Sequence, residues 1–97
     1  MRVLSKKILR DFWLIHSDCE HQLKSWYLEA DKGNWKNFNE LKRDYPSVSI
    51  LNDNRACFNI KGNNYRLIVL VNFDYQMMWI RFVGTHSEYD KIDANKI

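Results

Sequence analysis

Cysteine and proline are scarce in this sequence, and no long apolar run occurs. The two cysteines, Cys19 and Cys57, show neither CxxC nor any other paired spacing. This argues against a disulfide framework and for reduced thiols in a cytosol. No segment approaches the ~20 apolar residues that a membrane-spanning helix needs, and the opening MRVLSKKILRDFWLIH lacks an uninterrupted apolar stretch. We therefore expect a soluble, cytoplasmic protein that does not bind membranes.

The chain has 97 residues, which is enough for one domain over residues 1–97 and excludes a second catalytic domain. It contains no repeat, low-complexity segment or linker. The net charge of +3 is too small to indicate a nucleic-acid binder by itself. Between residues 55 and 81, however, four basic residues accompany a single acid, Asp74, so a locally positive surface is expected.

The first half of the sequence predicts helices. Apolar residues recur at helical spacing in SKKILRDFWLIHS, SDCEHQLKSWYLEADKG and NWKNFNELKRDYP. Ser5 is an expected N-cap, whereas Gly33 and Pro46 are expected to end the second and third helices. The first two segments should form a helical hairpin. The residues expected to face inward are Ile8, Leu9, Phe12, Trp13, Ile15, Cys19, Leu23, Trp26, Tyr27, Ala30, Trp35, Phe38 and Leu41.

The second half of the sequence predicts strands. ACFNIKG, NYRLIVLVNFD and QMMWIRFVG are rich in β-branched and aromatic residues and are separated by the turn signals GN and DY. The apolar run LIVLV is typical of a central strand that is covered on both faces. MRVL could add a short strand. The expected fold class is α+β, with two layers: N-terminal helices packed on one face of a C-terminal antiparallel β-meander.

Strand alternation then predicts which polar side chains share a face. A turn at residues 62–63 places Asn59 opposite Arg66, whereas a turn at residues 63–64 places Lys61 there. Both registers bring Asn59, Lys61 and Arg66 to one face.

A turn at residues 74–75 would pair Arg66 with Val83 and make Arg81 a diagonal neighbour of Arg66 on that face. Like charges on adjacent strands cost up to ~1 kcal/mol, so an anion is their natural complement. A phosphodiester fits best because guanidinium groups bind its oxygens bidentately.

His86 follows the last strand, and Tyr89 lies three residues further on. If a helix starts there, an imidazole and a phenol lie at the edge of the basic face. Each residue also has a plainer interpretation. Arg66 and Arg81 could form structural ion pairs, and His86 could be an N-cap or an ordinary surface residue.

The cluster HSDCEH contains His16, Cys19 and His21, which superficially resemble metal ligands. A fourth ligand is missing, and an amphipathic helix would occupy part of the cluster, so no metal or other cofactor is expected. Cys57 lies within a strand without an evident base, which disfavours a role as nucleophile.

Two stretches, FNIKGNNYRLIVLV and WIRFVGTHSEYDKIDA, occur in fixed order, and GNWKNFNELKRDYPSV lies upstream. With them the chain resembles the HigB toxins of bacterial toxin-antitoxin pairs, within the RelE-like group of mRNA interferases. The resemblance implies a sheet with helices on one face and metal-free cleavage of mRNA on the ribosome. It also implies neutralisation by a HigA antitoxin with a helix-turn-helix domain, through which alone DNA would be contacted.

Carried onto this chain, the RelE-like pattern assigns the active site to Lys61, Arg66, His86 and Tyr89. His86 stands where RelE itself has an arginine, and Tyr89 reaches the equivalent position only with a gap. Arg66 and Lys61 would hold the phosphate while the ribose 2′-hydroxyl attacks it, and His86 would protonate the leaving oxygen. Tyr89 could be the base if cations lower its pKa, or could stack on a nucleobase. Further RNA contacts are expected from Arg55, Asn59, Arg81 and Lys91.

Two alternatives use the same residues. A non-catalytic RNA- or ribosome-binding protein would hold phosphates on the basic face without cleaving them. The basic face could also receive an acidic antitoxin segment, although the helical hairpin could equally be the antitoxin surface.

Overall fold

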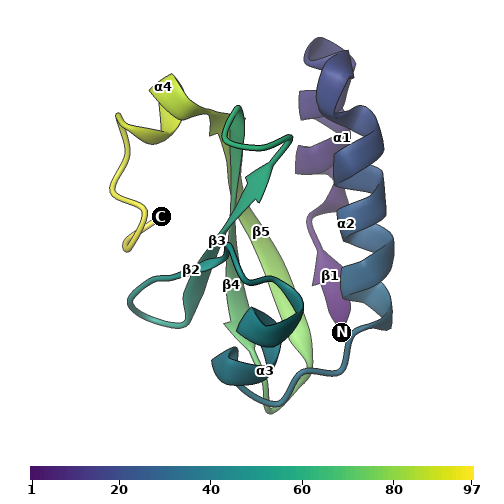
Figure 1. The fold of residues 1–97 in the computed structure, drawn as a ribbon, viewed down its shortest axis with the longest axis vertical. Coiled ribbons are helices and arrows are strands. Elements are labelled where there is room, and N and C mark those ends of the chain that lie inside the picture. Colours follow the sequence, from purple (N-terminus) through teal and green to yellow (C-terminus); the bar gives the residue numbers. More distant parts are fainter.

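The computed structural model describes residues 1–97 and has the expected α+β architecture. Figure 1 shows α1 and α2 on one side of a twisted sheet, with α4 and the C-terminal segment on the other side. We call these sides the helix face and the back face of the sheet. In chain order the elements are β1 (Arg2–Leu4), α1 (Lys6–Ile15), the 3-10 turn η1 (Ser17–Cys19), α2 (Glu20–Lys32), α3 (Phe38–Asp44), β2 (Ser49–Ile50), β3 (Arg55–Ile60), β4 (Tyr65–Asn72), β5 (Met77–Thr85) and α4 (His86–Tyr89).

The sheet has five strands in the order β1-β5-β4-β3-β2. The predicted antiparallel meander is present as β3, β4 and β5. The short strand predicted from MRVL is also present, and it pairs with β5 in parallel, which makes the sheet mixed. No sequence pattern predicted β2, a strand of two residues that pairs with β3.

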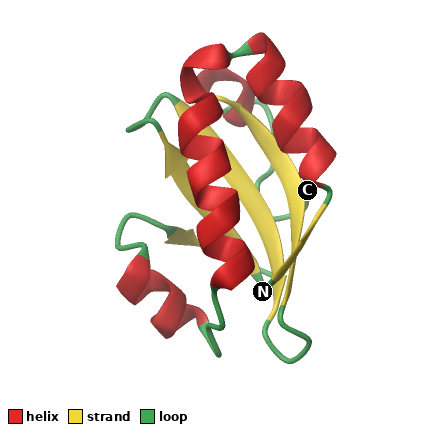
Figure 2. Cartoon of the chain, turned by 90° about the vertical axis from the view of Figure 1, so that its right-hand side faces the viewer, coloured by secondary structure: helices red, strands yellow, loops and turns green.

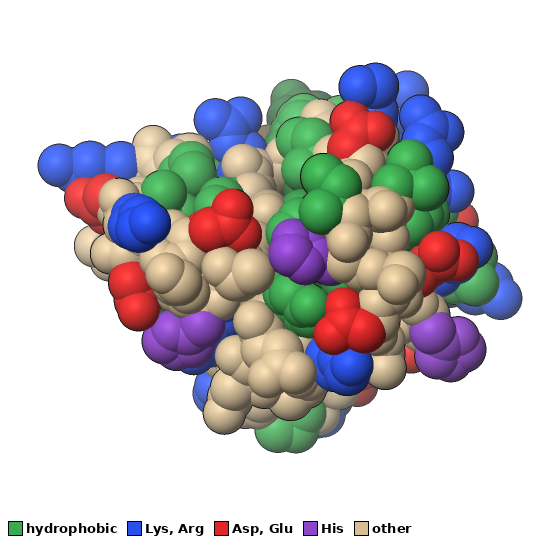
Figure 3. Space-filling view, turned by 90° about the horizontal axis from the view of Figure 1, so that it is seen from above, with side chains coloured by type: hydrophobic (Ala, Val, Ile, Leu, Met, Phe, Trp, Pro, Cys, Tyr) green, Lys and Arg blue, Asp and Glu red, His purple; other side chains and the backbone are tan.

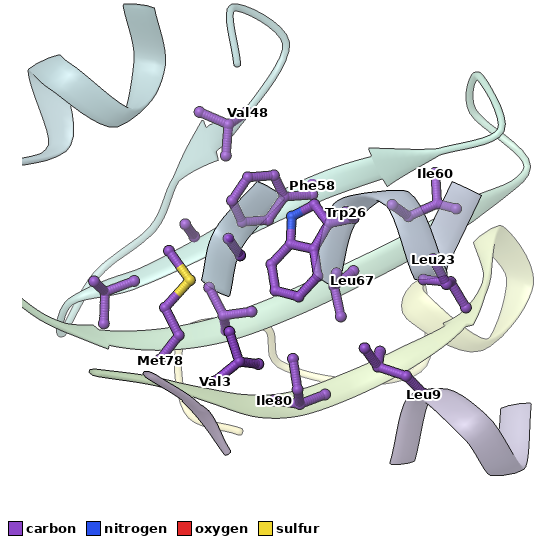
Figure 4. Close-up of a cluster of buried hydrophobic side chains, with 14 of the residues drawn as sticks. Val3, Leu9, Leu23, Trp26, Val48, Phe58, Ile60, Leu67, Met78 and Ile80 are labelled. Atoms are coloured by element: carbon purple, nitrogen blue, oxygen red, sulfur yellow. The ribbon is translucent and has the colours of Figure 1, made fainter. Parts of the chain in front are cut away.

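The main core lies between the sheet and the helices, which Figure 2 shows in front of the strands. Leu9 and Leu23 from the helices meet Leu67 and Ile80 from the sheet, and Trp26 packs edge-on against Phe58 (Figure 4). Burial of apolar side chains from both layers is the dominant force that holds them together.

The buried stripe of α1 is narrower than predicted. Leu9 and Trp13 are buried, but Ile8 is 39% exposed and Ile15 is 80% exposed, so their assignment to the core was wrong. Both line a shallow depression on the surface together with Phe12 and Val83. Ser5 occupies the N-cap position with φ of 70°, but its side chain makes no capping hydrogen bond.

α2 and α3 end where the sequence predicted, next to Gly33 and shortly before Pro46. Gly33 ends α2, and a Cβ atom at this position would lie 2.3 Å from the ring of Trp35, so the close approach requires glycine. Trp35 is buried, as expected, although it precedes α3 rather than lying within it. α3 begins after Asn37, whose side chain accepts the backbone N–H of Glu40 at 2.9 Å.

The back face carries a second, smaller apolar cluster. Cys57 and Ile68 from the strands are covered by Ala94, with Tyr89 and Ile92 packed around them. The prediction that the LIVLV strand is covered on both faces is therefore confirmed. No helix of the structure has the length and apolar character that crossing a membrane would require.

Candidate active site at the end of the sheet

Four of the predicted site residues, Lys61, Arg66, His86 and Tyr89, lie near the end of the sheet where the β3–β4 turn (residues 61–64) meets the junction of β5 and α4. We call this the upper end, because it lies at the top of Figure 1. The register pairs Tyr65 with Thr85 and Arg66 with Gly84, so His86 follows directly beyond the Tyr65 pair. Figure 3, which views this end, shows basic, acidic and histidine side chains on its surface.

Arg66 projects from β4 onto the back face. Asn59 lies opposite it, as one of the two considered registers predicted. Arg66 Nη1 donates a hydrogen bond to Asn59 Oδ1, and its Cζ atom lies 5.4 Å from the centre of the Tyr89 ring. The Nε atom is buried without a partner. The fixed guanidinium is therefore half-buried between an amide and an aromatic ring.

Arg66 is not part of an ion pair, so the plainer interpretation of this residue as a structural bridge does not apply. The ion pairs of the chain use other basic groups, namely Lys7, Lys24, Lys61, His86 and Lys96.

Lys61 does not share the face of Arg66, and this expectation was wrong. Its Nζ atom lies 3.0 Å from Asp18 Oδ2, on the helix face. Lys61 has a φ of 53° and belongs to the turn, and alternation holds only for residues in extended conformation. A cavity of about 230 Å³ between α2 and β3 lies beside Lys61. The two predicted phosphate ligands thus flank the upper end from opposite faces of the sheet.

Arg81 does not pair as predicted either. Val69 pairs with Ile80 and Ile68 with Phe82, so Arg81 is the extra residue of a β-bulge. The bulge shifts the register by one residue, and Arg66 therefore faces Gly84 instead of Val83. Arg81 is exposed and makes neither an ion pair nor a side-chain hydrogen bond.

His86 is the first residue of α4 and is exposed. It is not the N-cap, because that position belongs to Thr85, which forms a capping box with Glu88. Thr85 Oγ1 accepts the Glu88 N–H at 3.1 Å, and Glu88 Oε1 accepts the Thr85 N–H at 2.8 Å. His86 Nδ1 lies 3.3 Å from Asp90 Oδ2, so the carboxylate orients the imidazole. Nε2, the other ring nitrogen, makes no contact of this kind.

Tyr89 lies one turn of α4 after His86, as predicted, and is half-buried. Burial raises the pKa of its hydroxyl, the nearby Cys57 raises it further, and the opposing effect of Arg66 is smaller. The condition for Tyr89 to act as a base, a pKa lowered by cations, is therefore not met. Burial also raises the pKa of the Cys57 thiol, which keeps it protonated at neutral pH.

The remaining predicted RNA contacts are dispersed. Arg55 begins β3 at the opposite end of the strand from the β3–β4 turn, where its Nε donates to the Ile97 carbonyl at 2.7 Å. The amide of Asn59 serves Arg66, and its Nδ2 lies 3.5 Å from the Ser47 carbonyl. Lys91 is exposed just after α4.

Sequence reasoning missed Asp18 and His16, which lie where α1 passes into η1. Asp18 Oδ1 accepts the Tyr65 hydroxyl at 2.7 Å while its Oδ2 pairs with Lys61. His16 stacks on Phe12, with ring centres 4.3 Å apart, and its ring centre lies 5.5 Å from that of Tyr65. These residues belong to HSDCEH, which was considered as a metal site and as the start of a helix, and no local pattern indicates contact with a turn more than forty residues away.

Comparison with known proteins identifies the family of this chain. Residues 19–92 match the HigB toxin family, described as the RelE-like toxic component of a toxin-antitoxin system. The chain belongs to this family. It is 32% identical over 96 residues to the mRNA interferase toxin HigB of Escherichia coli K12. The aligned residues make up 97% of this chain and 92% of that protein. The mRNA interferases HigB of E. coli O157:H7 and of Shigella flexneri show the same identity and coverage.

Membership of the HigB family implies an antitoxin partner. Lys61, Arg66, His86 and Tyr89 all lie within the matched residues, whereas β1, α1 and Asp18 precede them. The upper end of the sheet is thus the part of this HigB-family chain near which Lys61, Arg66 and His86 lie.

Proposed function

We propose that this chain is a ribosome-dependent mRNA endoribonuclease that inhibits translation and is neutralised by a HigA-type antitoxin. Membership of the HigB family and the names of its relatives support this proposal. The observation that carries it is the pairing of Tyr65 with Thr85, which brings Lys61, Arg66 and His86 to one end of the sheet.

The reaction would proceed by attack of the ribose 2′-hydroxyl on the adjacent phosphate, without a metal ion. The proton of this hydroxyl passes to solvent water, because Tyr89 stays protonated. The bond between phosphorus and the 5′-oxygen breaks, and a 2′,3′-cyclic phosphate forms. Negative charge accumulates on the phosphoryl oxygens, so fixed cations directed at them supply the largest stabilisation. Arg66 suits this role because Asn59 and the Tyr89 ring hold its guanidinium before RNA arrives.

Lys61 would contact the phosphate from the other side of the upper end. Its side chain is 38% exposed, so the ammonium is accessible although it is paired with Asp18. A cation on each side of the phosphate fits an RNA strand that crosses the end of the sheet, rather than one that lies along the back face.

His86 would protonate the departing 5′-oxygen. Its side chain is 53% exposed, and the contact with Asp90 uses Nδ1, so Nε2 is not engaged by this pair. Histidine is the side chain that most often transfers protons in enzymes. Tyr89 acts here through its ring, which packs against Arg66, and not as a base.

The test is mRNA cleavage in a translating system of purified ribosomes, with 5′ ends of the fragments mapped by primer extension. We expect the wild-type chain to cut mRNA only when it is being translated, and Arg66→Ala to abolish cutting while circular dichroism remains unchanged. A matched control is Arg43→Ala, because Arg43 is an exposed arginine of α3 away from the upper end.

Intact mRNA with the wild-type chain, together with salt-sensitive RNA binding, would favour the non-catalytic RNA-binding alternative instead. Undiminished cutting by Arg66→Ala would remove Arg66 from the site.

A further inference from the structure

We propose that Asp18 is a positioning residue of this active site, which fixes the Lys61 ammonium where the RNA phosphate is bound. The inference rests on the proposed function and extends it to a residue outside the segment that matches the family. Asp18 itself does not touch the substrate; it acts through Lys61.

The contacts of Asp18 are specific. One carboxylate oxygen accepts the Tyr65 hydroxyl at 2.7 Å, and the other lies 3.0 Å from Lys61 Nζ. These two contacts join η1, in the helical hairpin, to both ends of the β3–β4 turn. Tyr65 is 8% exposed and is fixed in the main core, so it holds the carboxylate in place for Lys61.

The backbone of Lys61 agrees with this role. Lys61 and Gly62 both have positive φ values, 53° and 66°. This conformation is strained for a residue other than glycine, and in the observed turn the ammonium reaches Asp18 rather than lying on the face of Arg66. A half-exposed ion pair contributes little to stability. The contact with Asp18 instead gives the long, flexible side chain of Lys61 a defined position.

Asp18 stays ionised at neutral pH, because its hydrogen bond from Tyr65 and, secondly, that from Lys61 lower its pKa. This negative charge lies beside the proposed phosphate site and opposes RNA binding. Asp18 should therefore have two effects of opposite sign. It orients Lys61 for the reaction, which raises kcat, and it repels the substrate, which raises KM.

These opposite effects distinguish positioning from a purely structural role. Asp18→Asn is nearly isosteric and removes the charge. We expect kcat for cleavage of mRNA on programmed ribosomes to fall about tenfold through misplacement of Lys61. We expect KM to fall about twofold to threefold at low ionic strength, because the nearby negative charge is gone. Asp18→Glu keeps the charge and should retain the wild-type KM.

Asp18→Asn in a Lys61→Ala background completes the experiment. If Asp18 acts through Lys61, the second substitution should not lower kcat further. Glu20→Gln is the matched control, because it removes a partly exposed carboxylate two residues away that pairs with Lys24. This variant should keep the wild-type kcat and KM.

Several results would overturn the inference while the proposed function stands. These are an unchanged kcat in Asp18→Asn, an equal loss in the Lys61→Ala background, or a kcat loss that follows the unfolded fraction measured by thermal melting. If Asp18→Asn does not fold, a KM above the wild-type value in Asp18→Glu would also overturn the inference. A wild-type chain that leaves translated mRNA intact would instead overturn the proposed function, and this inference with it.

Discussion

At the scale of single residues, the imidazole of His86 is exposed to solvent and is oriented by Asp90. Its side chain is 53% exposed and contacts Asp90, and no core residue depends on it. His86→Ala should therefore lower kcat by roughly 10²- to 10⁴-fold, the usual contribution of a proton-transfer group. Stability should change by less than ~0.5 kcal/mol. Cleavage assays and urea denaturation check both values, with His21→Ala, another exposed histidine, as the control. Wild-type rates in a folded His86→Ala variant would exclude it as the acid.

Removal of the Tyr89 hydroxyl, unlike removal of the His86 imidazole, should have little effect on kcat. Tyr89→Phe keeps the ring against Arg66 and removes only a hydroxyl whose pKa is raised by burial. Since such a hydroxyl remains protonated at neutral pH, kcat should fall by much less than the ~10²-fold expected for loss of a general base. Single-turnover cleavage measured between pH 6 and 9 would show this. A loss of ~10²-fold or more would restore Tyr89 to the proton-transfer chemistry.

At the scale of elements, α4 has only four residues and depends on its cap. Thr85→Ala removes the side chain that accepts the Glu88 N–H, which should cost about 0.5–2 kcal/mol. Because α4 carries His86, kcat should fall as well, although neither Thr85 nor Glu88 is assigned to the chemistry. Denaturation with urea gives the first value and ribosome-coupled cleavage the second. Thr85→Ser, which keeps the hydroxyl, should restore both. A Thr85→Ala variant with full activity would show that α4 need not be ordered for cleavage.

The elements also show how far sequence reasoning reaches. Strand alternation correctly placed Asn59 and Arg66 on one face, because both lie inside regular strands, and the structure has the one of the two considered registers that pairs them. It failed for Lys61, whose left-handed backbone ends the alternation, and for Arg81, which the bulge displaces. Neither departure has a local sequence signal, since lysine is unusual at positive φ and the bulge interrupts an otherwise regular run. The contact of Asp18 with Lys61 depends on tertiary packing and could not be predicted from spacing.

Helix periodicity had a similar limit. It correctly identified Leu9 and Trp13 as buried, but it also assigned Ile8 and Ile15 to the core. An apolar stripe in the sequence shows which residues could be buried, whereas the position of the neighbouring element decides how much of the stripe is covered.

At the scale of the whole molecule, stability depends on the central strand β4, which is covered on both faces. Leu67 is fully buried against the helices, so Leu67→Ala should cost roughly 2–5 kcal/mol. Leu14→Ala is the matched control, because Leu14 is 71% exposed. Its stability should stay within about 0.5 kcal/mol of the wild type. Equilibrium denaturation gives both values. A cost of less than ~1 kcal/mol at Leu67 would contradict the packing of the helices against β4.

The central claim concerns the whole molecule acting on RNA: groups at the upper end promote attack of a 2′-hydroxyl on its own phosphodiester. The most direct measurement uses an mRNA with a single 2′-deoxynucleotide at the mapped cleavage position, presented on translating ribosomes. We expect cleavage to cease at that position only, and the unmodified mRNA to yield fragments ending in a 2′,3′-cyclic phosphate. Cleavage of the deoxy-substituted message at the wild-type rate, or fragments ending in a free 3′-hydroxyl, would contradict the account.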